Sequence, residues 1–192
     1  MNPHFQPVAP EHASRLVNHG PTVLVTSAHQ GRRNVMAAAW SMPVEFTPPR
    51  IAVVIDKKTF TRELVSASGA FALCIPGAAL ADLTYAVGNC SGRDIDKFAR
   101  YGIEARPGPA LGMPLVEAGC VAWLECRLLP EPHTEEAYDT SFGEVLAAAA
   151  DSRVFANGRW SFRDDNPLLH TLHHLGAGHF VVASQTIRAR PL

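Results

Sequence analysis

The sequence predicts a β-rich, mainly antiparallel fold, which forms a closed or nearly closed barrel with a few helical insertions. Short apolar runs rich in β-branched residues are bounded by glycine, proline and polar residues, as is typical of strands. One run alternates polar with apolar residues, as a strand does when one face is buried and the other is wet. Strands and helices do not alternate regularly, which argues against a doubly wound parallel sheet.

Four strands are predicted in the first half of the chain, and they cover Thr22–Ser27, Val35–Trp40, Arg50–Ile55 and Ala70–Ile75. The first two form a β-hairpin, because they are short and a turn around Gly31 separates them. Pro48 and Pro49 set the third strand apart from this hairpin. A short helix is expected over Thr61–Ser68, and Gly69 supplies the glycine that commonly ends a helix.

After the fourth strand the sequence predicts helices first and strands later. Between Ala78 and Tyr101 the apolar residues have helical spacing with a break at 88–92, which predicts two short helices. Over Val121–Leu128 the polar residues Glu125 and Arg127 alternate with apolar ones, which predicts an antiparallel strand with those two side chains on the wet face. Residues 142–150 fit a helix because of their four alanines, and equally a buried strand in a tightly packed barrel wall.

Length and composition indicate one globular domain over residues 1–192. Hydrophobic residues make up 47% of the chain and charged residues 18%, which is the usage of a folded protein and not of a disordered one. No internal repeat or linker divides it. The formal net charge of −1 lacks the positive excess that binding to phosphates over a long footprint requires. Nucleic acid is therefore excluded as an expected partner.

The sequence also predicts a cytoplasmic location. Prolines at positions 3, 7 and 10 interrupt the start of the chain, where a secretory signal would need a continuous apolar stretch. No apolar run approaches the roughly 18 residues of a membrane-spanning helix. The four cysteines form no Cys-x-x-Cys pair, so we expect four reduced thiols.

Several common functional motifs are missing. The chain has no P-loop and no complete Gly-x-Gly-x-x-Gly, and Gly176-Ala177-Gly178 is interpreted as a turn. His170, His173, His174 and His179 form one local cluster, and positions i, i+3 and i+4 would share a helix face. Only Asp164 and Asp165 lie nearby as further metal ligands. We therefore predict no metal site and prefer a role in lining a cofactor or an interface.

Three segments together resemble the flavin reductase-like family, in particular its flavoredoxin branch. They are Asn34–Trp40, Asp56–Thr61 and Ser91–Phe98, in this order and separation. The likeness extends to Pro48-Pro49, to the run from Ser68 to Phe71, to the run from His173 to Gly176, and to Phe180. It spans roughly residues 20 to 182, so it does not depend on one motif. The resemblance implies an FMN-binding split β-barrel.

The resemblance also implies which residues bind the flavin. The ring would lie on a surface of small and apolar residues, which consists of Asn34, Val35, Met36, Ala37, Ala38 and Trp40. The family commonly has threonine where this chain has Ala37, so one hydroxyl group is lost there. A plain strand of small residues would have the same composition. His174 is a candidate for a contact near the nicotinamide or the flavin.

Phosphate binding is expected at the start of the helix predicted from Thr61. Positive charge and hydroxyl groups gather there, on Lys57, Lys58, Thr59, Thr61 and Arg62. Ser91, Arg93 and Lys97 form a second polar group of the same kind. That second group fits a helix-capping turn equally well, with Asp94 at the helix N-terminus.

The function implied by the resemblance is flavin-dependent electron transfer. FMN would be bound without a covalent bond, reduced by NADH or NADPH, and reoxidised by a downstream oxygenase or other redox acceptor. Because hydride chemistry belongs to the cofactors, no residue is assigned a catalytic role. The resemblance further implies a homodimer with the flavin at its interface. Two alternatives are a non-catalytic flavin- or haem-binding sensor or storage protein of the same barrel type, and a metal-dependent hydrolase built on the histidine cluster.

Overall fold

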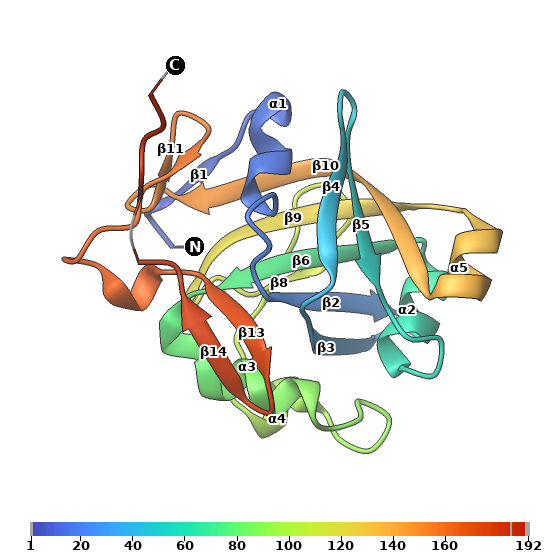
Figure 1. Ribbon diagram of the computed structural model, residues 1–192. Helices are drawn as coiled ribbons and strands as arrows, with labels where there is room; N and C mark the ends of the chain where they lie inside the picture. The colour runs from blue at the N-terminus through green and yellow to red at the C-terminus, as the bar shows by residue number, and fades with distance from the viewer. Residues whose placement is uncertain (1, 185, 191–192) are drawn as a thin grey trace.

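A strongly curved antiparallel sheet dominates the computed structural model, which describes residues 2–184 and 186–190 (Figure 1). The strands of this sheet are β1 (Phe5–Pro7), β2 (Val23–His29), β3 (Arg32–Ala38), β4 (Ser41–Phe46), β5 (Pro49–Val54), β6 (Ala70–Pro76), β9 (Cys120–Leu129) and β10 (Thr140–Asp151). Three short two-stranded sheets are β7 (Arg106–Pro107) with β8 (Pro114–Leu115), β11 (Phe155–Ala156) with β12 (Arg159–Trp160), and β13 (Leu172–Gly176) with β14 (His179–Val182).

The helices are short and lie around the sheet. They are α1 (Pro10–Ala13), α2 (Phe60–Ser68), α3 (Ala81–Gly88), α4 (Lys97–Arg100) and α5 (Pro132–Tyr138), with 3-10 turns η1 (Ser14–Leu16), η2 (Ala78–Leu80) and η3 (Pro167–Leu169). Within the described ranges, no helix is long and apolar enough to cross a membrane. The predicted helix before Gly69 is confirmed, since α2 ends there with Gly69 in the left-handed region at φ 67°.

The order of strands in the large sheet is β3-β2-β6-β9-β10-β5-β4, with β1 added beside β10. All of its pairings are antiparallel, which confirms the predicted strand arrangement. The two ends of this order are β3 and β4, which follow one another in the sequence but do not pair. β3 and β4 are therefore the two edge strands of the curved sheet. Because they do not pair, the barrel is open between them.

The four strands predicted in the first half are confirmed, and two further strands of the large sheet, β1 and β4, were missed. The predicted hairpin corresponds to β2 and β3, and its turn has positive φ at Gln30 and Gly31. The longer of the two missed strands is β4, at the edge of the sheet. Its alternate side chains are exposed and apolar instead of buried, so the usual pattern of a half-buried strand is reversed there.

Residues 142–150, which fit both helix and strand in the sequence, belong to strand β10. This strand pairs with β9 on one side and with β5 and β1 on the other. Successive alanines point to opposite faces, so that Ala148 and Ala150 enter one core cluster while Ala147 and Ala149 contact the other. Small side chains suit this position because Ala149 lies opposite the large Trp123. Tertiary pairing thus overrides the helix propensity of alanine.

Strand β6 separates the two core clusters and is buried along its whole length. Phe71, Leu73 and Ile75 point into the barrel, whereas Ala72 and Cys74 pack beneath the surface helices and loops. Period-two alternation with both faces covered explains why this run is apolar throughout. The core therefore has a layer inside the barrel and a second layer outside β6 and β9.

The prediction that Glu125 lies on a wet face of its strand is wrong. Arg127 is exposed, but Glu125 on β9 is fully buried. Its carboxylate accepts hydrogen bonds from the backbone N–H groups of Ala110, Leu111 and Met113 at 2.7, 2.9 and 2.9 Å. A loop folded over this face of the sheet therefore replaces the water that the alternating pattern predicted.

Candidate functional site

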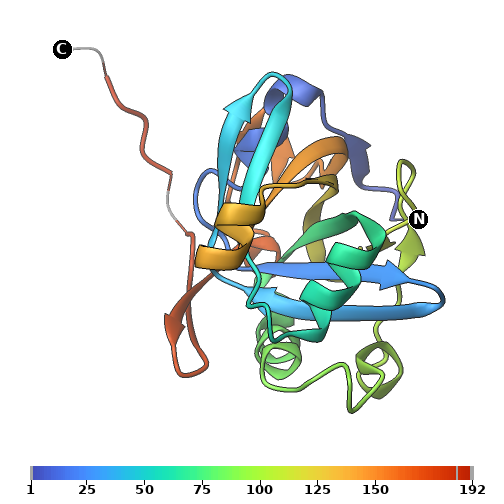
Figure 2. The same cartoon turned by 90° about the vertical axis from the view of Figure 1, so that its right-hand side faces the viewer.

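Two adjoining hollows lie where α2, α3 and the loop before α4 meet strand β3. Figures 1 and 2 show the position of these helices around the sheet. The first, hereafter the cationic hollow, has a volume of about 380 Å³ and is lined by Asn34, Met36, Lys58, Thr59, Phe60, Thr61, Val87, Gly88, Asn89, Cys90, Ser91, Gly92, Arg93 and Lys97. The second, hereafter the neutral hollow, has a volume of about 350 Å³ and is lined by Thr22, Ala37, Ala38, Ala39, Thr84, Tyr85, Gly88, Asn89, His174, Ala177 and Phe180. Gly88 and Asn89 line both.

Two glycines let the chain approach β3 closely at this place. A methyl group on Gly88 would lie 3.4 Å from the Cβ of Ala37, so the end of α3 rests directly on the strand. A methyl group on Gly92 would lie 2.8 Å from the ring of Phe60 and would overlap the Asn34 side chain. A side chain at Gly92 would force this segment off β3, whereas a methyl group at Gly88 would just touch the strand. Segments that are far apart in the sequence thus form one continuous surface.

The structure brings together most of the residues predicted to bind FMN. Eight of them line the cationic hollow, namely Asn34, Met36, Lys58, Thr59, Thr61, Ser91, Arg93 and Lys97. Three line the neutral hollow, namely Ala37, Ala38 and His174. The remaining two lie elsewhere. The side chain of Val35 is buried in the core, and Trp40 is 75% exposed on the strand edge outside both hollows.

Asn34 and Thr61 form a buried polar pair at the floor of the cationic hollow. The amide of Asn34 donates to the Thr61 hydroxyl at 2.8 Å, so the hydroxyl proton remains free to donate to a ligand. Asn34 is 3% exposed, and its Oδ1 has no hydrogen-bond partner among the described residues. A buried polar atom without a partner is costly in a finished structure. This pair is therefore suited to a ligand that brings hydrogen-bonding groups.

Arg93 joins the two polar loops of the cationic hollow. Its guanidinium donates to the carbonyl oxygen of Lys58 at 2.7 Å and forms an ion pair with Glu63 at 3.2 Å. It also lies over the ring of Phe60, 5.9 Å from the centroid. The Lys58 side chain lines the same hollow but makes no ion pair within the described part of the chain. Both cations thus border one space, and Lys58 has its donors free.

Lys97 is buried, although it carries a charge. Its Nζ donates to the carbonyl oxygens of Val35 at 2.9 Å and Val87 at 2.7 Å, and burial lowers its pKa. These two bonds tie α4 both to β3 and to the end of α3. One of the three ammonium donors remains for a ligand. Lys97 thus fixes the wall between the hollows as well as lining one of them.

The hydroxyl groups of Thr59 and Ser91 are partly engaged by the backbone. Thr59 caps α2, since its Oγ1 accepts from the N–H of Arg62 at 3.2 Å and donates to Asp56 O at 2.8 Å. Ser91 Oγ accepts from the N–H of Arg93 at 3.1 Å. Ser91 therefore stabilises a turn and also lines the cationic hollow. The alternative interpretation of this group, a helix-capping turn with Asp94 at the helix N-terminus, is wrong in the residue it names.

Asp96 occupies that position instead, because its carboxylate accepts from the N–H groups of Phe98 and Ala99 at the start of α4. A shift of two residues in the expected helix start accounts for the error, since the cap must directly precede the first turn.

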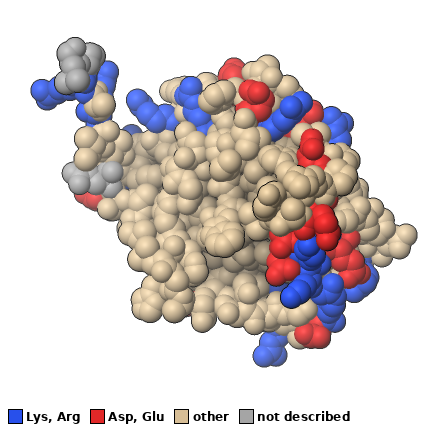
Figure 3. Space-filling model, turned by 45° about the vertical axis from the view of Figure 1, so that its right-hand side comes forward, with Lys and Arg blue, Asp and Glu red and all other residues tan. Residues whose placement is uncertain are grey.

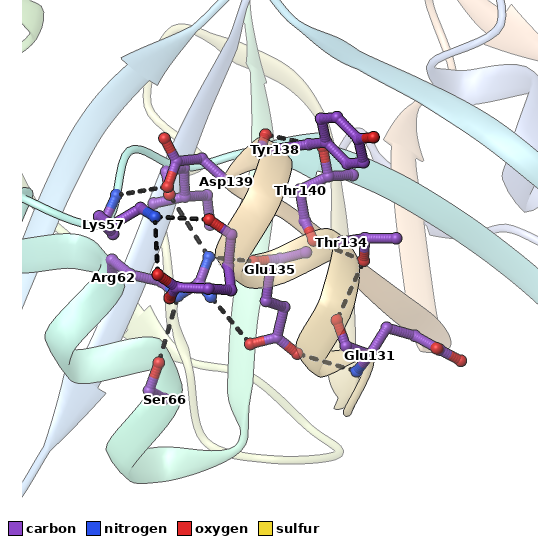
Figure 4. A network of polar contacts seen from close by, with 12 residues as sticks. Lys57, Arg62, Ser66, Glu131, Thr134, Glu135, Tyr138, Asp139 and Thr140 are labelled. Carbon is purple, nitrogen blue, oxygen red and sulfur yellow. Dashed lines mark hydrogen bonds and ion pairs between the residues drawn. The ribbon is translucent and has the colours of Figure 1, made fainter.

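Lys57 and Arg62, which were predicted to help bind phosphate, point to the opposite side of α2. Arg62 forms an ion pair with Glu135 at 2.8 Å and donates to Ser141 at 3.1 Å (Figure 4). The Lys57 amine pairs with Glu136 at 3.3 Å (Figure 4). Both residues attach helix α5 to the sheet. That part of the prediction is wrong because neighbouring residues at the start of a helix face different directions.

The neutral hollow is bordered by small and aromatic residues, and no Lys, Arg, Asp or Glu lines it within the described ranges. Thr22 and Thr84 are 3% and 0% exposed, and neither hydroxyl has a hydrogen-bond partner there. The rings of His174 and Phe180 lie 5.4 Å apart on the β13–β14 hairpin. The hollow therefore offers unused hydroxyl groups to a flat uncharged group of atoms.

Thr22, Thr84 and Phe180 were not among the predicted site residues. The sequence nevertheless contains a pattern that indicates a special role for Thr84. It follows Leu80 by four residues and precedes Val87 by three, so helical spacing places it on the face of α3 that packs on the protein. A polar residue at such a position is unusual unless it is hydrogen-bonded or faces a ligand.

The helical spacing considered for the histidine cluster is wrong, because residues 172–182 form a β-hairpin. His174 lines the neutral hollow, whereas His173 points to the other face of β13 and bonds to Thr171. His170 contacts the carbonyl oxygen of Arg163 at 2.8 Å, and His179 is exposed. Over residues 2–184 and 186–190, no three His, Cys, Asp or Glu side chains form a group that could hold a metal ion.

Known proteins resemble this chain along most of its length. Residues 15–179 match the family described as "Flavin reductase like domain". The uncharacterized protein YddH of Escherichia coli is 59% identical over 187 residues, which cover 96% of this chain and 98% of YddH.

Two solved structures give the same picture. An FMN-binding domain of a flavin reductases-like enzyme from Shewanella baltica superposes with a TM-score of 0.90 at 39% identity, and covers 97% of each chain. Flavoredoxin of Desulfovibrio vulgaris superposes with a TM-score of 0.75 at 25% identity, over 88% of this chain and 90% of the flavoredoxin. These similarities confirm the predicted fold class, a mainly antiparallel split β-barrel.

Proposed function

The chain belongs to the flavin reductase-like family, and on that premise we propose that it binds FMN across the cationic and neutral hollows and acts as an oxidoreductase. The observation that carries this proposal is the division of charge between two hollows that share Gly88 and Asn89. FMN has the same division, with a dianionic phosphate at one end and a flat, largely uncharged ring at the other.

The cationic hollow is the proposed site of the phosphate and its neighbouring hydroxyl groups. Lys58, Arg93 and Lys97 bring positive charge to it from two segments that are far apart in the sequence, Asp56–Thr61 and Ser91–Phe98. Thr61 has its hydroxyl proton free, and Asn34 presents an unpaired acceptor. Phosphate oxygens accept from such donors, and the hydroxyl groups of the ribityl chain donate to such an acceptor. The residues present therefore fit the polar half of FMN.

The neutral hollow is the proposed site of the ring system. Ala37, Ala38 and Gly88 leave room for a flat group to approach the backbone, and Phe180 and His174 border it with flat faces. The unpaired hydroxyl groups of Thr22 and Thr84 are suited to the carbonyl and nitrogen atoms along the polar edge of the ring. The residues present therefore fit this half of FMN as well.

The role of the protein in the reaction would be to position the flavin and to shield it from water. When bound, the flavin supplies the redox chemistry, since it takes a hydride from NADH or NADPH and passes electrons to an acceptor. Lys97 holds the end of α3 against β3 and so fixes the ring site relative to the phosphate site. No acid or base of the chain is required for a hydride transfer between two cofactors.

We expect NADH or NADPH to reduce the bound FMN without any added protein. The full chain is saturated with FMN under anaerobic conditions, and the loss of the flavin band near about 450 nm is followed by stopped flow. Dithionite provides the positive control. If dithionite removes the band and neither nicotinamide does, the reductase proposal fails, and a carrier or sensor function replaces it.

We also propose that the chain is a homodimer joined through strand β4. Its outward-facing residues are apolar at every second position, since Trp40, Met42, Val44 and Phe46 are 75, 57, 40 and 68% exposed. This set is hereafter the β4 stripe. A run of large exposed apolar side chains on one strand favours a protein partner over water. Figure 3 shows a wide face of the molecule without charged side chains, with Lys, Arg, Asp and Glu gathered at its margin.

A second copy of the chain is the favoured partner because the stripe continues into the proposed flavin site. Ala39 lines the neutral hollow and also the apolar depression beside Trp40 and Met42. A protomer seated on the stripe would therefore border the ring of the flavin. Such a cover would protect the flavin, which a barrel of this size leaves open on one side.

Substitution within the β4 stripe is expected to separate the dimer. The parent chain should have about twice the mass of one 20.7 kDa chain in light scattering, whereas Trp40→Asp and Phe46→Asp should have the mass of one, since each buries a charge in the interface. Tyr138→Asp is the matched control, because Tyr138 is an exposed aromatic residue on α5 outside the stripe. A parent chain that is monomeric with FMN bound would contradict the proposal.

A further inference from the structure

A third hollow lies on the other face of strand β13 from the neutral hollow. Its volume is about 450 Å³, and its lining includes Arg15, His19, Arg159, Trp160, Phe162 and His173. His173 and His174 are neighbours on β13, so they point to opposite faces, one into each hollow. This third space, hereafter the aromatic hollow, is therefore separate from the proposed flavin site.

The floor of the aromatic hollow consists of flat rings in contact. Trp160 and Phe162 are stacked, with centroids 5.5 Å apart and planes inclined by 19°. The His19 ring lies 5.1 Å from Trp160 and 5.4 Å from His173. Such faces bind planar groups by stacking.

Hydrogen bonds hold these rings in place. The indole N–H of Trp160 donates to the carbonyl oxygen of Arg15 at 2.9 Å, and His19 and His173 both bond to the hydroxyl of Thr171. Because the rings are fixed, a planar ligand would not have to order them on binding.

The rim of the aromatic hollow carries positive charge that no acid neutralises. Arg15 and Arg159 come from different elements, and neither forms an ion pair within residues 2–184 and 186–190. Arg15 donates to the carbonyl oxygen of Gly158 at 2.9 Å, which holds its guanidinium beside the hollow. Burial, and then the neighbouring His173, lower the pKa of His19 to about 4. His19 is therefore neutral at neutral pH, and the two arginines carry positive charge there.

We propose that the aromatic hollow is a second ligand site, which takes a planar aromatic carboxylate. The ring would stack on Trp160, and the carboxylate would meet the guanidinium groups, whose paired N–H donors match two carboxylate oxygens. The volume falls within the range of roughly 300–1,000 Å³ that small-molecule sites occupy. Ala183 and Ile187 also line the hollow.

The probe for this site is 2-naphthoate, and its neutral counterpart is 2-naphthalenemethanol. In a heteronuclear NMR titration of the full chain, the three tryptophans give three indole N–H signals, and Trp160→Phe identifies the one from Trp160. We expect 2-naphthoate to shift the Trp160 signal in a saturable way and to bind at least about tenfold more tightly than the alcohol. Absence of a saturable Trp160 shift at millimolar naphthoate would overturn the proposal.

Arginine variants make the test specific. Arg159→Gln and Arg15→Gln should each weaken naphthoate binding roughly tenfold, since each removes a charge-assisted contact. Arg163→Gln is the matched control, because Arg163 is a nearby exposed arginine that does not line the hollow. Equal affinity in all three variants would show that the naphthoate binds elsewhere. If Arg15→Gln fails to fold, Arg159→Gln still decides, since its side chain makes no hydrogen bond in the described structure.

Discussion

Replacing Lys58 by alanine is expected to weaken FMN binding roughly tenfold to a hundredfold and to leave riboflavin binding nearly unchanged. Lys58 lines the cationic hollow, and its side chain forms no ion pair within residues 2–184 and 186–190. A charge-assisted hydrogen bond to an anion contributes about 1.5–3 kcal/mol, which corresponds to this loss of affinity. Riboflavin lacks the phosphate, so it should respond little. The measurement is the dissociation constant of each flavin by fluorescence quenching.

Lys57→Ala provides a matched control for Lys58→Ala. The two lysines are adjacent and both exposed, but the Lys57 amine pairs with Glu136 on α5, and Lys57 does not line the cationic hollow. FMN affinity should therefore stay near that of the parent in Lys57→Ala. Equal effects of the two substitutions would indicate long-range attraction instead of contact. If Lys58→Ala binds FMN as well as the parent does, the phosphate lies against Arg93 and Lys97 or outside this hollow.

The strands could be predicted from the sequence where burial and residue type agree. Strand β6 is buried on both faces, and its continuous apolar run was recognised. Strand β4 was missed because its apolar residues face outward, so the alternation of its residues does not mark a buried face. The secondary structure of residues 142–150 could not be decided from the sequence, because alanine by itself favours helix. Only the pairing of β10 with β9 and β5 makes this segment a strand.

The candidate site could be predicted as a set of segments but not as a set of side-chain directions. The resemblance pointed to Lys58 and Arg93, which line one hollow. It did not separate Lys58 from Lys57, because which side of a turn a lysine faces depends on the location of acids such as Glu136. It did not reveal Thr22 either, since a threonine before a strand is common and its unpaired hydroxyl is visible only in three dimensions.

Glu125 is an example of a side chain whose role depends on a loop that the strand pattern does not include. The loop from Gly108 to Met113 folds over β9, and a methyl group on Gly108 would collide with the Glu125 carboxylate. The loop is also closed on itself, since the N–H of Gly108 donates to the carbonyl oxygen of Met113 at 2.8 Å. Three backbone N–H groups converge on the two carboxylate oxygens. Glu125 thus stabilises a connection that has little regular structure of its own.

Glu125→Gln is expected to lower the free energy of unfolding by about 2–4 kcal/mol. The substitution keeps the volume but replaces one acceptor by an amide donor, which meets a backbone N–H, and it turns the other bonds from charge-assisted into neutral ones. Relief from burying a charge offsets part of this loss, yet the three short bonds already compensate that burial. Urea unfolding followed by circular dichroism measures the change as a lower midpoint at unchanged slope.

The matched control is Glu144→Gln, on the neighbouring strand β10. Glu144 pairs with Arg127 at 3.0 Å, and the Arg127 side chain is 54% exposed, so water screens the pair and its loss should cost less than about 1 kcal/mol. The two substitutions are chemically identical, so their difference isolates the converging N–H groups. If Glu125→Gln costs as little as Glu144→Gln, water must enter this site and accept the hydrogen bonds of the backbone N–H groups in place of the carboxylate. In that case the Gly108–Met113 loop is held by its own backbone bonds and by the burial of Met113.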